Sequence, residues 1–467
     1  MTTQAGDGVL DGPARAERCE RGQAVADELR AQGVAIVALC WVDNTGVTRV
    51  KAIPVGRLER AAGWGIGMSP VFDVFLVDDS ITTSPFIGGP GGDLRLIPDL
   101  GRLTVLAAQP GWAMAPADRY TQDGQVHAAC QRSFARRMAA LAGSHGLEFR
   151  VSFEVEWAAG TEHEGGFVPA CTGPAYGMTR VVELSDYSRE VVVALEREGV
   201  TVEQFHPEYA AGQLEVSVAP ASPVGAADLN VLVRQTIRAV SARFGFQASF
   251  APSVVAGSVG NGAHVHLSVW RGGRNLLHGG PGPHGMTGEG EAFAAGILAE
   301  LPALAGIGMP SAASYLRLVP SHWAGAYQCW GLENREAALR LVTGSAGEQQ
   351  ARANIEIKCF DPAANPYLAV GSLIAAGLAG MAAGSRLPPE FNGDPAGRPG
   401  GELEALGVRR LPESLGEAAD HLRASTLLRE SMGEALFEAI AAVRQGEAAL
   451  FAAASPGDIA AQTRWRW

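Results

Sequence analysis

The order of apolar and polar residues divides the chain into two regions of different predicted structure. In the first 120 residues the apolar blocks are short and are separated by turn-forming residues. The blocks that we interpret as strands are residues 34–43, 47–55, 71–78 and 102–109. The first two flank a turn at 44–46, which is the pattern of a β-hairpin. A short helix is expected over residues 23–32, and the polar residues up to 20 are expected to be frayed. The pattern predicts a small, mainly β domain.

Beyond the polar segment 120–128, longer helical and strand-like blocks alternate. The helical blocks are residues 130–146, 188–198, 226–243, 365–385 and 414–454. The strand-like blocks are residues 147–160, 200–209 and 261–270. Residues 365–385 form a long apolar block, but Gly and Ala dominate it, so we expect a buried core helix rather than a membrane span. The polar segment is the expected domain boundary.

Composition narrows the class of protein. The chain has 467 residues with 37 Lys+Arg against 49 Asp+Glu, so its net charge is −12, which argues against a nucleic-acid-coating protein. The N-terminus lacks the apolar core of a secretion signal, and we expect a cytoplasmic protein without a membrane segment. The six cysteines show no close spacing, which argues against a zinc site and a disulfide framework.

Polar residues two positions apart occur in several strand-like blocks. Side chains alternate between the faces of a strand, so each such pair shares one face. Two like charges this close are costly unless a cation lies between them. An oxygen-rich set with an imidazole favours Mg²⁺ or Mn²⁺ over zinc. The alternative is a set of solvated strand faces. The residues are Glu154 and Glu156, His264 and His266, Glu356 and Lys358, and the pair Glu208 and Glu215 around a turn.

Three arginines are the candidate anion-binding residues. Arg317 lies in SYLRLVP, and Arg335 and Arg340 lie in NREAALRL. Guanidinium groups match phosphate and carboxylate oxygens, although surface ion pairs would explain the same residues. Carboxylate-held metals together with arginine indicate phosphoryl transfer. The chain has no G-x-x-x-x-G-K-[ST] motif and no G-x-G-x-x-G context.

Taken together, the motifs resemble those of the glutamine synthetase family. The matching segments, in family order, are DNTGVTRVK (43–51), FEVEW (153–157), EQFHPEYAAGQLEV (203–216), NGAHVHLSV (261–269), SYLRLVP (314–320), NREAALRL (334–341) and IEIKCFDPAANPYL (355–368). The resemblance implies an α+β fold with an N-terminal β-grasp domain (22–122) and a catalytic domain (123–467) with an antiparallel half-barrel site. It also implies an ATP-dependent ligase assembled as a dodecamer of two hexameric rings.

The resemblance assigns roles residue by residue. Two or three Mg²⁺ or Mn²⁺ ions are implied: Glu156, Glu208 and Glu215 for one, and Glu154, His264 and Glu356 for the second. Contacts to ATP are implied for Glu203, His266, Ser268, Arg335 and Arg340. Contacts to glutamate are implied for Glu156, Gly260, His264, Arg317 and Lys358.

Departures from the family pattern concern the amine. Trp323 stands where the family has the Glu that binds ammonium, and an indole offers only a cation–π contact. Val259 replaces a glutamate-contacting Asn, and Lys358 replaces an Arg. The carboxylate that a neighbouring subunit supplies to the ammonium site corresponds to Asp78 or Asp79. The metal and phosphate residues are kept while the ammonium site is rebuilt.

The sequence therefore predicts a γ-glutamyl-amine ligase. Ethanolamine is the favoured amine, because a polyamine brings a second ammonium that needs a carboxylate and residues 319–325 supply none. His322 could accept the amine's proton, with Arg317, Arg335 and Trp323 completing the catalytic set. A γ-glutamylpolyamine synthetase is the alternative, and a catalytically silent oligomer is the alternative from another class.

Overall fold

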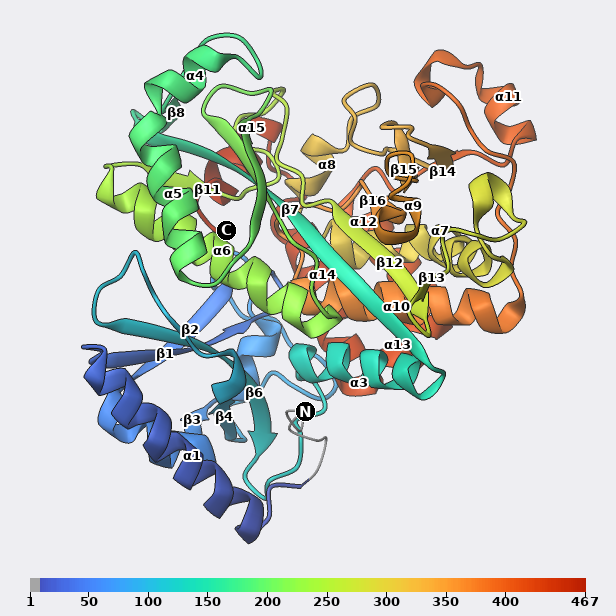
Figure 1. Ribbon diagram of the computed structural model, residues 1–467. Coiled ribbons are helices and arrows are strands. Elements are labelled where there is room, and N and C mark those ends of the chain that lie inside the picture. Colours follow the sequence, from blue (N-terminus) through green and yellow to red (C-terminus); the bar gives the residue numbers. More distant parts are fainter. Residues whose placement is uncertain (1–8) are drawn as a thin grey trace.

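The computed structural model describes residues 9–467, which form a smaller part around a six-stranded sheet and a larger part around an eleven-stranded sheet (Figure 1). The smaller part contains α1 (Gly12–Ala31), β1 (Ile36–Val42), β2 (Thr48–Pro54), η1 (Val55–Arg57), α2 (Leu58–Trp64), β3 (Ile66–Met68), η2 (Pro70–Val74), β4 (Leu94–Pro98), η3 (Leu100–Arg102), β5 (Thr104–Val105) and β6 (Trp112–Thr121), where η denotes a 3₁₀-helix. Its strand order is β2-β1-β6-β4-β3, with β5 also paired to β6. The expected hairpin is confirmed, because Ile36 pairs with Pro54 and Val42 with Thr48.

Other expectations for this part are wrong. Helix α1 starts at Gly12, where the Asp11 side chain accepts the amide N–H of Ala14 at 2.9 Å, so residues 12–20 are not frayed. Residues 1–8 of the segment expected to be frayed lie outside the described residues. The block 71–78 forms no named strand and begins with the 3₁₀-helix η2. Only Thr104–Val105 of the block 102–109 is a strand, and the pattern gave no sign of β4 and β6.

The larger part carries the candidate site. It contains α3 (Gln131–Ser144), β7 (Leu147–His163), β8 (Gly166–Pro169), α4 (Met178–Glu183), α5 (Ser185–Arg197), β9 (Val202–Pro207), β10 (Gln213–Val218), α6 (Pro223–Arg243), β11 (Gln247–Ser249), β12 (Val265–Arg271), β13 (Arg274–Asn275), η4 (Pro283–Gly285), α7 (Gly288–Gly308), α8 (Ser314–Arg317), β14 (Tyr327–Leu332), β15 (Ala337–Val342), α9 (Gln349–Arg352), β16 (Asn354–Ile357), α10 (Pro366–Ala383), η5 (Pro395–Gly397), α11 (Gly400–Ala405), β17 (Arg409–Arg410), α12 (Leu415–Ala424), α13 (Thr426–Met432), α14 (Glu434–Leu450) and α15 (Pro456–Thr463).

The eleven-stranded sheet follows the order β17-β14-β15-β16-β12-β7-β10-β9. Every neighbouring pair along that path is antiparallel except β14 with β15, which confirms the expected α+β fold with a mainly antiparallel catalytic sheet. The long strand β7 crosses the middle of the larger part and pairs with both β12 and β10 (Figure 1). Residues on these three strands are therefore held in fixed register.

Helices α7 and α10 form much of the core behind the sheet. Both are long and apolar enough to cross a membrane, but 83% and 72% of their most apolar windows are buried inside the protein. This burial confirms the expected core helix at 365–385 and adds α7, which the sequence pattern did not reveal. The block 414–454 is three helices rather than one, because Ser425 caps α13 and Gly433, with φ of 82°, precedes α14.

Candidate functional site

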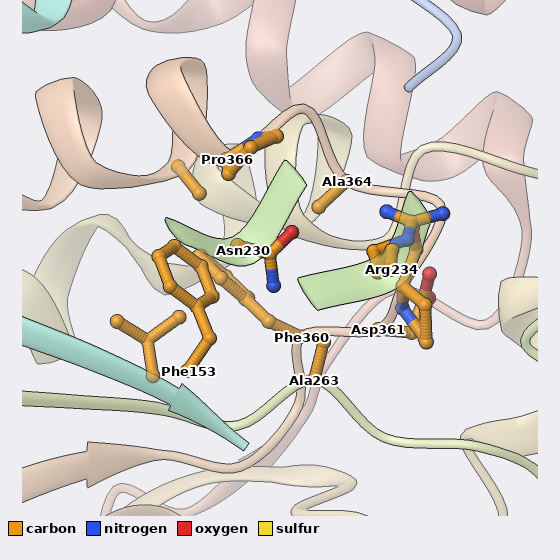
Figure 2. Close-up of a pocket in the computed structure, with 11 residues that line it drawn as sticks. Phe153, Asn230, Arg234, Ala263, Phe360, Asp361, Ala364 and Pro366 are labelled. Atoms are coloured by element: carbon orange, nitrogen blue, oxygen red, sulfur yellow. The ribbon is translucent and has the colours of Figure 1, made fainter. Parts of the chain in front are cut away.

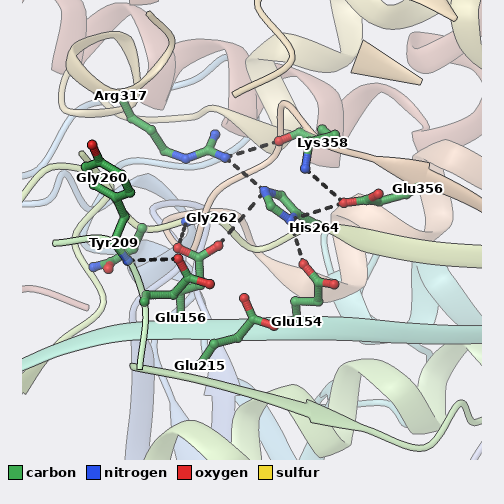
Figure 3. Close-up of polar contacts among 12 residues, drawn as sticks. Glu154, Glu156, Tyr209, Glu215, Gly260, Gly262, His264, Arg317, Glu356 and Lys358 are labelled. Carbon is green, nitrogen blue, oxygen red and sulfur yellow. Dashed lines mark hydrogen bonds and ion pairs between the residues drawn. The ribbon is translucent and has the colours of Figure 1, made fainter. Parts of the chain in front are cut away.

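The predicted metal-binding residues Glu154, Glu156, Glu215, His264 and Glu356 lie close together, with Arg317 and Lys358 beside them (Figure 3). Glu154 and Glu156 project from β7, and Glu215 on β10 lies opposite Glu156. On the other side of β7, Glu356 on β16 is the register partner of His266 on β12. Two groups of ligand atoms result, each lying within 4.8 Å of one another.

The first group consists of Glu154, His264 and Glu356, the three residues that the resemblance assigned to one metal ion. The His264 Nδ1 lies 2.6 Å from the Glu154 carboxylate and 3.3 Å from that of Glu356. Burial, with the charge of Lys358, lowers the pKa of His264 to about 4. Its imidazole is therefore neutral at pH 7, which is the form that binds metals.

The second group consists of His206, Glu208 and Glu215. His206 lies 3.4 Å from Glu208 through Nδ1 and 3.3 Å from Glu215 through Nε2. Sequence reasoning missed His206, although it is the register partner of Glu215 across β9 and β10. Its place in the HPEY segment, two residues before Glu208, was the signal that could have revealed it.

Glu156 joins this group through charge rather than through close contact. Burial, together with Glu215 and Glu208, raises the pKa of Glu156 to about 8. One Glu156 oxygen accepts the N–H of Gly262 and the side-chain N–H of Gln213, each at 2.9 Å. A buried carboxylate crowded by two others is the environment that a divalent cation stabilises, so this donor set fits Mg²⁺ or Mn²⁺.

Lys358 and Arg340 both bind Glu356. The Lys358 Nζ lies 3.1 Å from one Glu356 oxygen, and the Arg340 Nη1 lies 2.9 Å from the other. Burial acts to raise the pKa of Glu356, but Lys358 and His266 overcome it and hold that pKa at about 2. Lys358 is thus engaged within the protein, while the resemblance had assigned it to glutamate.

Arg317 lies beside His264 of the first group. It is 7% exposed, and its Nη2 lies 3.2 Å from the His264 Nε2 and 3.1 Å from the Lys358 carbonyl oxygen. Two glycines allow this approach. A Cβ on Gly260 would lie 3.0 Å from the Arg317 side chain, and one on Gly262 would lie 2.5 Å from the His264 ring. The backbone around Gly260 therefore packs against Arg317.

The residues assigned to ATP are less closely grouped. His266 contacts Glu154 at 3.0 Å; burial opposes its charge, but Glu154 outweighs burial and raises its pKa to about 9. Ser268, further along β12, accepts the Trp270 indole N–H at 2.8 Å. Glu203 lies exposed on the edge strand β9. Arg335 is exposed, with its guanidinium carbon 5.9 Å from the ring centre of Trp323.

The segment 319–325 lies next to Arg335. Trp323 is 55% exposed, with φ of 55°, and its amide donates to Glu336 at 2.8 Å. The exposed His322 donates from Nδ1 to the Pro320 carbonyl at 2.9 Å, which leaves Nε2 as a proton acceptor. His322 and Trp323 thus lie on a surface segment, apart from the buried carboxylate groups.

Asp78 and Asp79 differ in their contacts. Asp79 has φ of 70° and pairs with Arg49 at 2.8 Å and Arg466 at 2.9 Å. Asp78 accepts the amide and hydroxyl of Ser80 within its own turn. Asp78 is therefore the better candidate for a carboxylate offered to another molecule.

A small cavity lies deeper in the fold, lined by Asn230, Arg234 and Asp361 among others (Figure 2). Its volume is about 10 Å³, which is the space for one water molecule rather than for glutamate or a nucleotide. This cavity is therefore too small to be the substrate site.

Comparison with known proteins places these observations in context. The family description "Glutamine synthetase, catalytic domain" matches residues 128–459, and "Glutamine synthetase N-terminal domain" matches residues 20–128. The chain is 55% identical to the gamma-glutamylpolyamine synthetase GlnA3 of Streptomyces coelicolor, over 96% of this chain and 97% of that protein. It is 29% identical to the glutamine synthetase of Methanocaldococcus jannaschii, over 90% of this chain and 92% of that one.

Solved structures show the same fold. A crystal structure described as a novel glutamine synthase homolog superposes with a TM-score of 0.83 at 32% identity, covering 93% of this chain and 99% of the other. An ADP complex of GmaS gives a TM-score of 0.81 at 24% identity, covering 92% and 96%. The second likeness concerns the fold alone.

Proposed function

The chain belongs to the glutamine synthetase family, and from that we propose that it is a cytoplasmic γ-glutamylpolyamine synthetase. Membership makes it an ATP-dependent ligase. In the proposed reaction, the γ-carboxylate of glutamate receives the γ-phosphoryl group of ATP. An amine of the polyamine then displaces phosphate and forms the γ-glutamyl amide.

The observation that carries the proposal is the pair of carboxylate–imidazole groups on either side of β7. Divalent ions held there would neutralise charge on the transferred phosphoryl group. Glu154, His264 and Glu356 would hold one ion, and Glu156, Glu208 and Glu215, with His206 beside them, would hold another. The exact number of ions, two or three, is part of the proposal.

Other residues bind and orient the substrates in this proposal. Arg317 would bind the glutamate carboxylate, since it is buried and reaches His264 from the open side. Arg335 and Arg340 would stabilise charge on the phosphates. Glu203, His266 and Ser268 would line the nucleotide site. His322 would accept a proton from the amine through Nε2.

Two observations favour a polyamine over ethanolamine. The S. coelicolor protein, 55% identical, is named for polyamines. The sequence argument for ethanolamine rested on residues 319–325 supplying no carboxylate of their own, whereas Glu336, from outside that segment, accepts the amide N–H of Trp323 at 2.8 Å. Ethanolamine therefore becomes the comparison substrate.

The assembly is also part of the proposal. The resemblance to the family implies a dodecamer of two hexameric rings, with Asp78 reaching a neighbouring subunit's amine site. Sedimentation of the purified protein would test the ring count directly. A monomer with full activity would contradict it.

The proposed activity is tested by ADP release and product mass with ATP, Mg²⁺ and glutamate. Spermine, spermidine, putrescine, ethanolamine and ammonia are compared at equal concentration. We expect γ-glutamyl adducts of the polyamines to dominate. A product mixture that is mainly γ-glutamylethanolamide or glutamine would reject the polyamine assignment. If no amine in the panel caused ADP release, a silent oligomer would be favoured. Glu156→Gln should abolish turnover, while Glu404→Gln, the same change on exposed α11, should not.

A further inference from the structure

Three chain segments meet at Trp323. Its amide N–H donates at 2.8 Å to the Oε1 of Glu336, which lies in the turn between β14 and β15. The hydroxyl of Ser321 donates at 2.6 Å to Asp394, which lies immediately before η5. The guanidinium of Arg335 lies toward the Trp323 ring. The indole is thus held at its backbone and left 55% exposed at its ring.

Glu336 is a buried carboxylate that Lys358 influences through its charge without forming an ion pair with it. It is 7% exposed and forms no ion pair with any of residues 9–467. Its Oε1 accepts the Trp323 amide N–H. Its Oε2 is buried and has no hydrogen-bond partner among the described residues. An unpartnered, desolvated carboxylate oxygen costs free energy, so a positive ligand would be strongly favoured there.

Most carboxylates of the site already have a cationic neighbour. Glu356 has Lys358, and Glu215 has His206. Glu156 lacks one but shares the crowded group that suits a divalent ion. Glu336 belongs to neither metal group; burial and the acidic neighbour Asp394 raise its pKa, while the Trp323 amide and the charge of Lys358 act to lower it. It therefore has the electrostatics of a site for a monovalent organic cation.

Resting on the proposed function, we propose that Glu336 binds an ammonium group of the amine substrate, with the indole of Trp323 forming the second wall of that subsite. Both groups recognise an alkylammonium ion: the carboxylate through a charge-assisted hydrogen bond, and the indole face through a cation–π contact. The carboxylate absent from position 323 is thus supplied by position 336, from the strand connection beneath it.

Access to the Glu336 Oε2 requires a shift of the segment 319–325. Ser321 and Trp323 both have left-handed φ values, 62° and 55°. Such a conformation costs a non-glycine residue stability, so this segment gains by relaxing when a ligand enters. Glu336 itself lies immediately before β15 (Ala337–Val342), outside the shifting segment.

The test is Glu336→Gln in the full-length protein. Glutamine keeps an oxygen to accept the Trp323 amide, so the segment stays anchored while the negative charge is lost. We expect KM for spermidine to rise about 10- to 100-fold, since a hydrogen bond to a charged group is lost. γ-Glutamyl hydroxamate formation with hydroxylamine, which is uncharged at neutral pH, should change less than about twofold. Glu404→Gln is the matched surface control.

Equal losses with spermidine and hydroxylamine would overturn the proposal, because they would mean that Glu336 only supports the segment. An unchanged KM for spermidine would overturn it as well. Calorimetry compares the affinity of the parent and of Glu336→Gln for spermidine, and it tests the same contact without turnover. Hydroxamate formation by the unmodified protein separates the two failures: if it is absent, the proposed function fails irrespective of Glu336.

Discussion

Glu156 and Glu215 lie directly opposite each other on β7 and β10, with no lysine or arginine paired to either among residues 9–467. Burial and the neighbouring carboxylates raise the pKa of Glu156 to about 8. The folded, metal-free protein therefore holds a proton that the unfolded chain releases near its ordinary value of 4.5. The close approach of these two carboxylates lowers the stability of the metal-free fold, and a bound divalent ion can restore it.

The first prediction concerns pH and Mg²⁺. Without metal, the unfolded state binds fewer protons than the folded state between about pH 4.5 and 8, so stability should fall as pH rises through that window. Mg²⁺ binds the deprotonated cluster, so its stabilising effect should be larger at pH 8 than at pH 6. Thermal unfolding with EDTA and with saturating Mg²⁺ at both pH values measures this.

Glu156→Gln is the informative variant for that experiment. It removes the titrating group, so the metal-free pH dependence over this window should flatten and the Mg²⁺ effect should shrink. A Mg²⁺ stabilisation of equal size in the variant and the parent would place the ion elsewhere.

The second prediction concerns Lys358, which is 2% exposed and bound to Glu356 at 3.1 Å. Lys358→Met leaves Glu356 with Arg340 as its remaining lysine or arginine partner among the described residues, beside the imidazole of His264. We expect a loss of about 2 kcal/mol in unfolding free energy, the scale of one hydrogen bond to a charged group. Urea unfolding measures it, with Lys358→Arg as the charge-conserving control.

The same variant should change the pH response of the metal site. Lys358 is the charge that, after burial, lowers the pKa of His264, so its removal should raise that pKa. A His264 that protonates more readily should lose Mg²⁺-dependent activity at a higher pH when the solution is acidified. If the activity of variant and parent fell at the same pH on acidification, Lys358 would not control the pKa of His264.

Much of the fold followed from periodicity, but β6 did not. Its sequence contains Pro116, Asp118 and Arg119, which suggest a loop. In the fold Arg119 pairs with buried Asp73 from a distant segment. Asp118 is likewise paired, so the strand is buried on both sides and shows no alternation. Ion pairs made only in the folded state hide such a strand from a local pattern.

The same reason separates the site residues that were predicted from those that were missed. Glu154 and Glu156 were visible because two residues of one strand share a face. His206 lies two residues before Glu208, but its contact with Glu215 comes from the register of β9 with β10, which the sequence does not show. Glu336 lies between Arg335 and Ala337 in a motif that drew attention to its arginines. Its importance depends on the segment 319–325 folding over it.

The third prediction concerns Trp323. Trp323→Gly removes the indole and suits the left-handed φ of 55°. We expect KM for spermidine to rise about two- to fivefold, the value of an exposed cation–π contact. The unfolding midpoint should stay unchanged, because relief of backbone strain offsets the added freedom of the unfolded chain. The KM of Trp323→Phe should lie between those of the parent and of Trp323→Gly. An unchanged KM in both variants would show that the ring does not contact the amine.

The fourth prediction separates Asp78 from Asp79. Asp79→Asn breaks pairs with Arg49 and Arg466 at a half-exposed position, so it should cost at most about 1 kcal/mol of stability. Its turnover should remain near that of the parent. Asp78→Asn should keep the unfolding midpoint and lower the turnover of amines. Thermal unfolding and steady-state kinetics on both variants decide, and the reverse pattern would assign the amine site to Asp79.

The last prediction concerns the C-terminal residue. Trp467 is 1% exposed, packs in the cluster that includes Trp157 and Phe250, and donates its indole N–H to the Thr45 carbonyl at 2.7 Å. It thereby joins the segment after α15 to the β1–β2 turn. Trp467→Ala should cost about 3–5 kcal/mol, as for other buried aromatic truncations. Trp465→Ala, two positions earlier and partly exposed, should cost clearly less. Equal losses in urea unfolding would show that the Thr45 contact of Trp467 adds no stability of its own.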